Sequence, residues 1–252
     1  MIGLADVVCL GTSYRLASHE RPMLRIFALA LTILTALSAP SRADNPVVVE
    51  LFTSQGCSYC PPADALLHDL AGRENVIALA LHVDYWDYIG WKDAFADPAH
   101  TNRQREYALE GNRRSIYTPQ MIVNGKTVIV GTKPMELLDT ISKYMSMPSP
   151  VDLTVKRDGQ SIAINASAEN TEGSLIVHLV HYVPEQSVKI TRGENAGRTL
   201  TYANIAQDWN VLAEWNGATP LNLTATAKAP LPVVILVQQG VAGPILAAAE
   251  VK

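Results

Sequence analysis

The residues with the clearest capacity for chemistry are two cysteines, Cys57 and Cys60, which are separated by two residues. Two thiols at this spacing can close into a disulfide or open into a dithiol. If a helix begins beside them, its free N–H groups and partial positive charge stabilise a thiolate and lower the pKa of the first thiol. We therefore expect Cys57 to be the exposed thiol that attacks a disulfide, and Cys60 to be the shielded thiol that resolves the mixed disulfide.

Other roles for the same pair are also open. A purely structural disulfide would stabilise the fold by only about 2 kcal/mol, because the closed ring is short. A zinc site needs four ligands, and no second CxxC or close histidine pair completes one. Two thiolates suit Cu(I), so a copper-binding or assembly module is the main alternative, followed by a non-catalytic binding domain. We favour redox chemistry, with no cofactor and no resident metal.

The segments around the cysteines predict a βαβ unit. Residues 47–52 form a β-rich run, residues 61–70 have a helical apolar face, and residues 76–83 are almost wholly apolar. The prolines that follow Cys60 suit a first helical turn, where their missing N–H has no partner to lose. Two strands joined by a helix are parallel, with a right-handed crossover.

The chain from 84 to 150 predicts a helical insertion and then a ββα unit. Residues 84–116 are first aromatic and then polar and helical. Two apolar runs at 121–123 and 127–130 are separated by Asn124-Gly125, which is a strong hairpin signal. A helix over 134–144 ends the first expected domain, which covers residues 46–147. Residues 147–150 read as a linker.

The remaining chain, residues 150–252, predicts a β-sandwich. Short apolar runs with alternating character follow one another at close spacing, separated by turn residues. The expected architecture is therefore an α/β domain followed by an all-β domain.

The amino end has the features of an exported protein. An apolar run at 26–37 follows Arg21 and Arg25 and precedes small residues up to Ala43. This succession predicts a secretory signal peptide over residues 1–43, with the true start possible at Met23. We expect a periplasmic or secreted protein that keeps no stable membrane span after cleavage.

Composition excludes some partners. Apolar residues make up 48% of the chain and charged residues 17%, which is typical of a globular protein. The net charge is −4, and no basic block is longer than Arg113-Arg114. A nucleic-acid partner is not expected, because phosphate binding needs a basic face.

The strand–CxxC–helix unit, together with residues 118–125 (TPQMIVNG), resembles the thioredoxin superfamily. The resemblance implies a thioredoxin-like fold in which Pro119 is a cis-proline beside the cysteines, with Thr118 and Pro119 contacting an extended substrate. It also implies that Cys57 is the nucleophile and Cys60 the resolving thiol. The chain departs from that pattern in having Gly56 before the first cysteine and in its longer insertion.

A closer resemblance is to a family of secreted bacterial proteins, domain of unknown function 1223. Four stretches carry it, at 50–64, 82–93, 117–121 and 192–198. The family implies a thioredoxin-like fold and no established substrate.

Further residues are candidates for the site. Glu50, at the end of the first strand, could accept the proton of Cys60 if burial raises its pKa. Tyr85 and Trp86 could line a peptide groove, although packing against the core is the simpler role. His82 is expected to be a hydrogen-bonded core or near-site residue rather than a ligand. The loop at 193–198 is expected to be a shaped turn that can contact the first domain. The favoured function is a thiol–disulfide oxidoreductase acting on extracytoplasmic proteins, with a redox partner that the sequence does not name.

Overall fold

The computed structural model describes residues 45–228 and 230–252. The expected signal peptide at 1–43 and the alternative start at Met23 lie outside the described residues. The described residues form one compact unit. In the described part of the chain, no helix has the length and apolar character that a membrane crossing needs.

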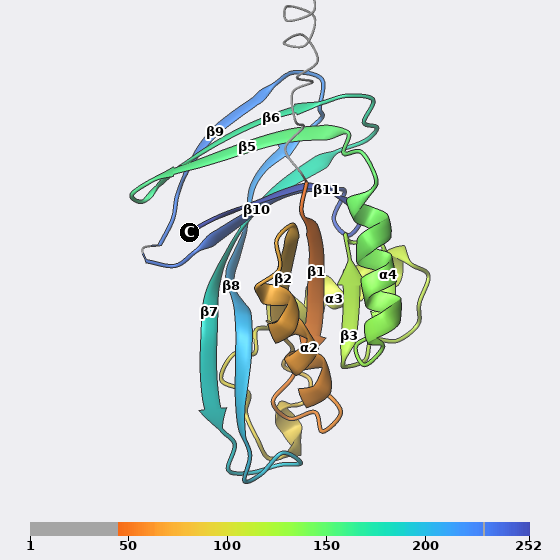
Figure 1. The fold of residues 1–252 in the computed structure, drawn as a ribbon, viewed down its shortest axis with the longest axis vertical. Helices are drawn as coiled ribbons and strands as arrows, with labels where there is room; N and C mark the ends of the chain where they lie inside the picture. Colours follow the sequence, from red (N-terminus) through yellow and green to blue (C-terminus); the bar gives the residue numbers. More distant parts are fainter. Residues whose placement is uncertain (1–44, 229) are drawn as a thin grey trace, which may run out of the picture. The chain divides into compact units, whose positions relative to one another are not determined.

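The first half of the described chain has the expected order of elements, which is βαβ, a helical insertion and then ββα (Figure 1). Each of its α-helices begins at a proline, where the fixed φ suits a first turn. The elements are β1 (Val47–Thr53), α2 (Pro61–Ala71), β2 (Val76–His82), the short 3₁₀ helix η2 (Asp87–Ile89), α3 (Pro98–Glu110), β3 (Gln120–Val123), β4 (Thr127–Val130) and α4 (Pro134–Met145).

The second half consists of strands, as expected from its alternating sequence. Two of them, β7 and β8, are much longer than the others, at 15 and 17 residues. The strands are β5 (Val151–Asp158), β6 (Ser161–Ala168), β7 (Leu175–Lys189), β8 (Thr199–Trp215), β9 (Leu221–Thr226), β10 (Val233–Gln239) and β11 (Ile245–Val251).

The two halves share one sheet. Its strand order is β11-β10-β7-β8-β2-β1-β3-β4, and a second sheet has the order β5-β6-β9. The junction is between β2 and β8, which run parallel with Ala80 opposite Ile205. The expected all-β half is therefore continuous with the first half through this sheet.

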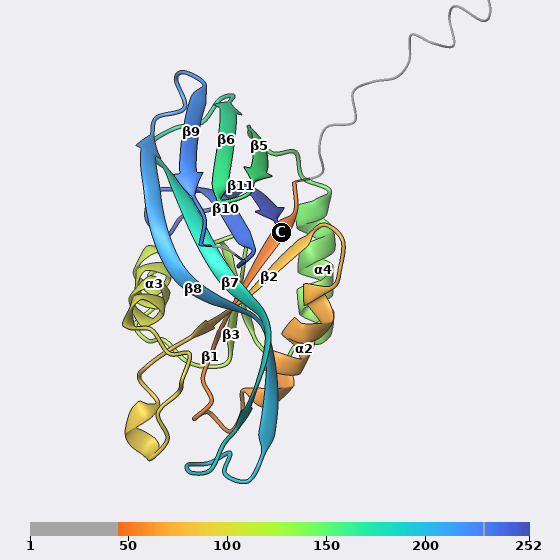
Figure 2. The ribbon, with the colours of Figure 1, turned by 90° about the vertical axis from the view of Figure 1, so that its left-hand side faces the viewer.

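The length of the β7–β8 hairpin explains this continuity. At one end of the hairpin, β7 pairs with β10 over Leu175–His181. Beyond that stretch the hairpin continues along β2 and α2 toward the end of the sheet where α2 begins (Figure 2). A sandwich is present in part, because the small sheet packs on the far end of the large one around a shared apolar core that includes Ile162, Ile164 and Val177.

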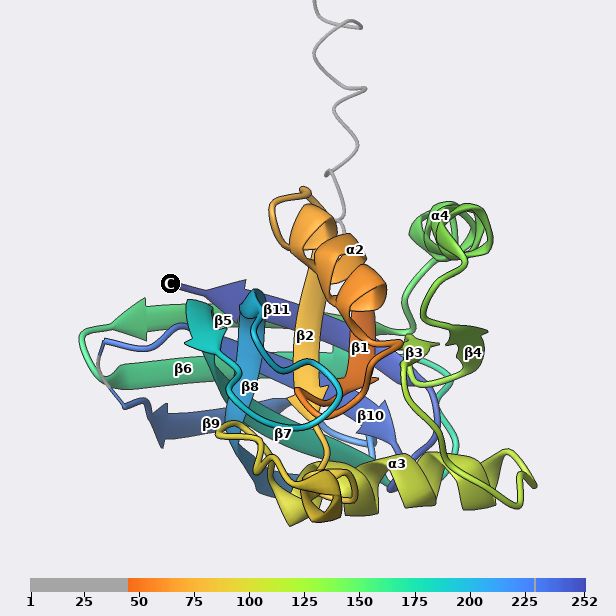
Figure 3. The ribbon, with the colours of Figure 1, turned by 90° about the horizontal axis from the view of Figure 1, so that it is seen from below.

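Helices cover both faces of the first-half strands. Figure 3 shows α2 and α4 on one face and α3 on the other. Alternate residues of β1 divide between the two cores: Val49 and Leu51 pack toward α2 and α4, whereas Val48 and Phe52 pack with Tyr107 of α3. Alternation of side chains along a strand therefore places Glu50 on the α3 face.

The Asn124-Gly125 hairpin is present as predicted, with β3 and β4 antiparallel. Both residues have positive φ, 47° and 66°, as a type I′ turn requires. Asn124 also fixes the hairpin to β1, because its Oδ1 accepts a 2.7 Å hydrogen bond from the N–H of Val48. The turn thus sets the position of the strand that follows the Thr118-Pro119 segment.

Candidate active site

Cys57 and Cys60 form a disulfide at the start of α2. Cys60 is the residue immediately before the helix, and its N–H donates to the carbonyl of Cys57 at 3.2 Å. The two cysteines are 1% and 0% exposed, so the expectation that Cys57 is exposed is wrong for the disulfide form. The loop folds inward at both sulfurs, and the residues between them, Ser58 and Tyr59, are the ones that face solvent.

Trp86 fills the space beside the disulfide loop. A Cβ added to Gly56 would lie 3.2 Å from the Cβ of Trp86 and 3.3 Å from Cδ1 of Ile89. A larger residue before Cys57 would therefore displace the insertion. This contact gives a physical reason for the glycine that departs from the thioredoxin pattern.

The Thr118–Pro119 bond is cis, as the resemblance implied. The indole N–H of Trp86 donates to Oγ1 of Thr118 at 2.7 Å, which joins the insertion to this segment. A Cβ at Gly131 would lie 2.9 Å from both the Pro119 and Ala63 side chains. Gly131 therefore lies between the side chain of Pro119 and that of Ala63 in the first turn of α2. This turn begins next to Cys60.

Tyr85 packs against α3 more than it faces the cysteines. Its hydroxyl donates to Oε1 of Gln104 at 3.2 Å, and the ring is half-buried against the core on the α3 face. Burial raises the pKa of Tyr85 to about 12. Trp86 packs against the same core, so the packing role that the sequence left open holds for both residues.

Glu50 does not approach the disulfide. It lies on the α3 face, where Nε of Arg103 donates to its Oε1 at 2.6 Å and the hydroxyl of Tyr107 donates to its Oε2 at 2.6 Å. Helix α2 covers the opposite face of the same strand. Glu50 is therefore one half of a buried ion pair, and the proton-acceptor role expected for it has no geometric support.

The buried acid on the side of the disulfide is Asp64, in the first turn of α2. Its N–H donates to the carbonyl of Cys60 at 3.0 Å, and its Oδ1 accepts a 2.7 Å hydrogen bond from Thr53. Burial raises the pKa of Asp64 to about 7, against the lowering effects of His82 and Thr53. The sequence held a signal for it, since Asp64 shares a helix face with Cys60 and the apolar Leu67.

His82 and Asp93 form a buried hydrogen-bonded pair near the disulfide loop. Nδ1 of His82 donates to Oδ2 of Asp93 at 2.7 Å, and both side chains are 0% exposed. The same Oδ2 accepts the N–H of Gln55 at 2.8 Å, which ties the pair to the disulfide loop. Burial alone would raise the pKa of Asp93, but His82 and the N–H donors bring it below its usual value. The prediction that His82 is a hydrogen-bonded core residue is confirmed.

The loop between β7 and β8 reaches the disulfide. Nδ2 of Asn195 donates to the carbonyls of Gln55 and Cys57, at 2.9 Å each. Gly193, with φ of 76°, lies against Trp91, whose indole N–H donates to Oε1 of Gln55 at 2.8 Å. The expected contact between this loop and the first half of the chain is therefore made at the site itself.

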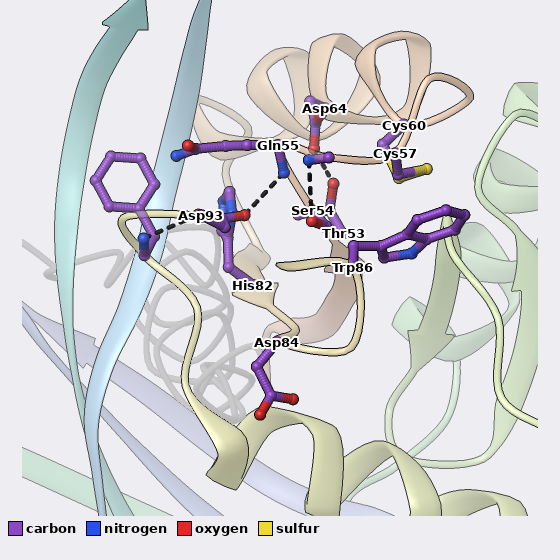
Figure 4. A network of polar contacts seen from close by, with 12 residues as sticks. Thr53, Ser54, Gln55, Cys57, Cys60, Asp64, His82, Asp84, Trp86 and Asp93 are labelled. Atoms are coloured by element: carbon purple, nitrogen blue, oxygen red, sulfur yellow. Dashed lines mark hydrogen bonds and ion pairs between the residues drawn. A yellow bond between two sulfur atoms is a disulfide. The ribbon is translucent and has the colours of Figure 1, made fainter. Parts of the chain in front are cut away.

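Figure 4 shows how these groups are arranged around the loop that carries the cysteines, with Asp64 on α2 and the His82–Asp93 pair at the end of β2. Within the described ranges 45–228 and 230–252, no three His, Cys, Asp or Glu side chains form a group that could hold a metal ion.

A disulfide at the start of a helix, in a chain that also has a cis-proline and a thioredoxin relative, indicates a redox-type role in a protein of the thioredoxin-like class. The family model described as "Protein of unknown function (DUF1223)" matches residues 48–238. The chain therefore belongs to the DUF1223 family.

Known proteins are similar to this chain over different lengths. A "Probable Thioredoxin" of Archaeoglobus fulgidus is 29% identical over 85 residues, which is 34% of this chain and 74% of the relative. A protein of Agrobacterium tumefaciens with a crystal structure is 29% identical, with a TM-score of 0.71 over 81% of this chain and 93% of that one. HBP35 of Porphyromonas gingivalis has a similar fold, with 14% identity and a TM-score of 0.56 over 82% and 75% of the two chains.

Proposed function

We propose that this protein is an exported thiol–disulfide oxidoreductase that exchanges disulfides with proteins outside the cytoplasm. The observation that carries the proposal is the Cys57–Cys60 disulfide at the first turn of α2, beside the Thr118-Pro119 segment that Trp86 holds. The similarity to a "Probable Thioredoxin", 29% identical over 85 residues, supports a redox role of this kind.

In the proposed reaction, the Cys57 thiolate attacks one sulfur of a substrate disulfide. A Cys57–substrate disulfide forms, and the other substrate sulfur leaves as a thiolate. Cys60 then attacks Cys57, which closes the Cys57–Cys60 bond and releases the second substrate sulfur. The substrate gains two electrons and the protein pair loses two; the reverse sequence oxidises a substrate dithiol.

Cys57 is assigned the attacking role because of its position. It precedes the helix by one turn, in a loop whose neighbours Ser58 and Tyr59 are exposed, and Tyr59 is 78% exposed. Cys60 directly precedes Pro61, which is the first residue of α2. Cys57 is 1% exposed in the disulfide form, so the loop that carries it must open when a substrate thiol attacks.

The extracytoplasmic location belongs to the same proposal. It rests on the order of segments at the amino end, where Arg21 and Arg25 precede an apolar run at 26–37 and small residues follow up to Ala43. The mature protein should begin at Asp44. Mass spectrometry of the exported protein checks this, and a mature chain that retains residues 23–43 would contradict it.

Trapping experiments with the mature protein test the redox function. Cys60→Ser should accumulate mixed disulfides with extracytoplasmic proteins, because the resolving thiol is missing, whereas Cys57→Ser should accumulate none. The matched double variant Cys57→Ser/Cys60→Ser is the background control. Equal trapping by the two single variants would remove the assignment of Cys57, and no exchange with any protein disulfide or dithiol would remove the function.

A further inference from the structure

The loop that joins β7 to β8, residues 190–198, forms the tip of the long hairpin. It follows Lys189 at the end of β7 and precedes Thr199 at the start of β8. The N–H of Gly197 donates to the carbonyl of Ile190 at 2.9 Å, so the tip has hydrogen bonds of its own. Figure 3 shows it between α2 and the insertion that contains η2. The tip can therefore act as one unit beside the disulfide loop.

The outer part of the hairpin is held less firmly than its base. In the described part of the chain, β7 pairs with β10 over Leu175–His181, whereas Glu185–Lys189 pairs with β8 alone. Two strands without a third neighbour are only marginally stable. The ion pair between His68 of α2 and Glu185 is exposed, so it adds little. The position of the tip therefore depends on the contacts made at the tip and just beyond it.

Asn195 joins the tip to the disulfide loop. It is 1% exposed, and its Nδ2 donates to the carbonyls of Gln55 and Cys57 at 2.9 Å each. Gly193 of the tip lies against the insertion, where an added Cβ would be 3.2 Å from the Cβ of Trp91. The tip thus binds the backbone of the disulfide loop and also packs against the insertion.

The contact between the hairpin and the disulfide loop leaves polar atoms unpaired. Nε2 of Gln55 and the hydroxyl of Tyr202, on β8 just beyond the tip, are buried and have no hydrogen-bond partner. Buried polar groups are paired in nearly all proteins. Movement of the outer hairpin would admit water to both atoms, and the new hydrogen bonds would offset part of the cost of breaking the Asn195 bonds. The closed arrangement can therefore open without unfolding the core.

The disulfide reacts only if part of its surroundings moves. Cys57 and Cys60 are 1% and 0% exposed, so a thiol cannot approach either sulfur in the closed arrangement. The elements on both sides of the disulfide loop, β1 and α2, pack into one apolar core. The tip residues on each side of Asn195, Glu194 and Ala196, are exposed. Movement of the tip therefore disturbs less buried surface than movement of β1 or α2.

We propose that Asn195 is a positioning residue for disulfide exchange, which holds the disulfide loop closed until the hairpin tip is released. The proposal rests on the thiol–disulfide exchange proposed above. After release, a substrate thiolate attacks the sulfur of Cys57. The substrate–Cys57 bond forms, the Cys57–Cys60 bond breaks, and Cys60 leaves as a thiolate that takes a proton from solvent. A second substrate thiolate then displaces Cys57, which leaves the substrate oxidised and the protein pair reduced.

Reduction of the oxidised mature protein by dithiothreitol tests the proposal. Alkylation with N-ethylmaleimide followed by mass spectrometry counts the thiols released at each time. Asn195→Ala should be reduced about tenfold faster than the wild type, because the closed arrangement loses two hydrogen bonds. Asn204→Ala is the matched control, since buried Asn204 of the same hairpin donates to the carbonyl of Ala78 at 2.9 Å. It should be reduced at the wild-type rate.

A second pair of variants leaves Asn195 intact. Gly193 and Gly197 both have positive φ, 76° and 83°, so alanine is strained at either position. Only Gly193 lies against the insertion, whereas a Cβ on Gly197 would meet no atom within 4 Å. Gly193→Ala should therefore push the tip away from Trp91 and speed reduction. Gly197→Ala should be reduced at the wild-type rate, even if Asn195→Ala fails to fold.

The dependence on urea separates release of the tip from general loss of stability. Reduction should change little in urea below the unfolding transition, because release of the tip exposes little surface. A steep increase with urea would show that global unfolding exposes the disulfide, and it would overturn the proposal. Equal acceleration in Asn195→Ala and Asn204→Ala, or wild-type rates in both Asn195→Ala and Gly193→Ala, would overturn it as well. Variants that behave as expected, in a protein that traps no protein substrate, would instead overturn the proposed function alone.

Discussion

The side chain of Asn195 donates both of its amide hydrogens to the disulfide loop, one to the carbonyl of Gln55 and one to the carbonyl of Cys57, each at 2.9 Å. Its Oδ1 accepts from Arg198 at 3.0 Å, so every polar atom of the buried amide is in use. Asn195, which belongs to the all-β half of the chain, thus binds the backbone of the loop that contains Cys57. The long β7–β8 hairpin is part of the site for this reason.

The first prediction concerns this contact. Asn195→Ala removes one donor from each of the carbonyls of Gln55 and Cys57, and leaves the Cys57 carbonyl with the N–H of Cys60 alone, which costs about 1–3 kcal/mol of unfolding free energy. Amide hydrogen exchange in residues 55–60 should accelerate more than exchange in the rest of the sheet. Asn210→Ala, an exposed asparagine on the same hairpin, is the matched control. Uniform loss of protection over the whole sheet would show that Asn195 has no local role.

The second prediction concerns the ion pair on the opposite face. Glu50→Ala removes the partner of a buried Arg103 and should lower the free energy of unfolding by about 3–5 kcal/mol in urea titrations. Its rate of exchange with glutathione disulfide should stay at the wild-type value, because Glu50 lies on the α3 side of β1. A large loss of exchange in a folded Glu50→Ala protein would show that Glu50 belongs to the redox site.

Local sequence patterns predicted the parts of this fold that short segments determine. The Asn124-Gly125 turn and the prolines that begin the helices act within a few residues, so their structures follow from residue type. The β1 strand is apolar on both faces around Glu50, and such a run does not reveal which face a helix will cover. Sequence alone therefore could not place Glu50 opposite to α2.

The remaining parts depend on contacts between distant segments. The pairing of Ala80 with Ile205 joins the two halves into one sheet, and nothing in either strand specifies this register. The His82–Asp93 pair and the Asn195 contacts likewise arise only when the insertion and the hairpin fold onto the cysteine loop. The spacing of Cys57 and Cys60 predicted that they pair. It could not predict which buried polar residues contact the loop that carries them.

The third prediction is a pH dependence of stability. The pKa of Asp64 is raised from 3.8 to about 7 in the folded protein, so the folded state holds a proton that the unfolded chain releases. The free energy of unfolding should therefore fall as pH rises from about 4 to 7, with a contribution of up to about 4 kcal/mol from this group. Subtracting the curve of Asp64→Asn, which has no such group, isolates the effect. Parallel curves for the two proteins would show that Asp64 titrates normally.

The last prediction concerns substrate positioning by Trp86. Trp86→Phe keeps an aromatic ring beside Gly56 but removes the donor to Thr118, which is worth about 1 kcal/mol. If the Thr118-Pro119 segment holds a protein substrate, the exchange rate with an unfolded protein disulfide should fall about fivefold, while the rate with glutathione disulfide should change little. Trp209→Phe removes a comparable indole donor on β8, the one that bonds His178 at 3.1 Å, and serves as the matched control. Equal losses with the large and the small substrate would mean that Trp86 supports the cysteines themselves, and equal losses in the two tryptophan variants would mean that the effect is one of general stability.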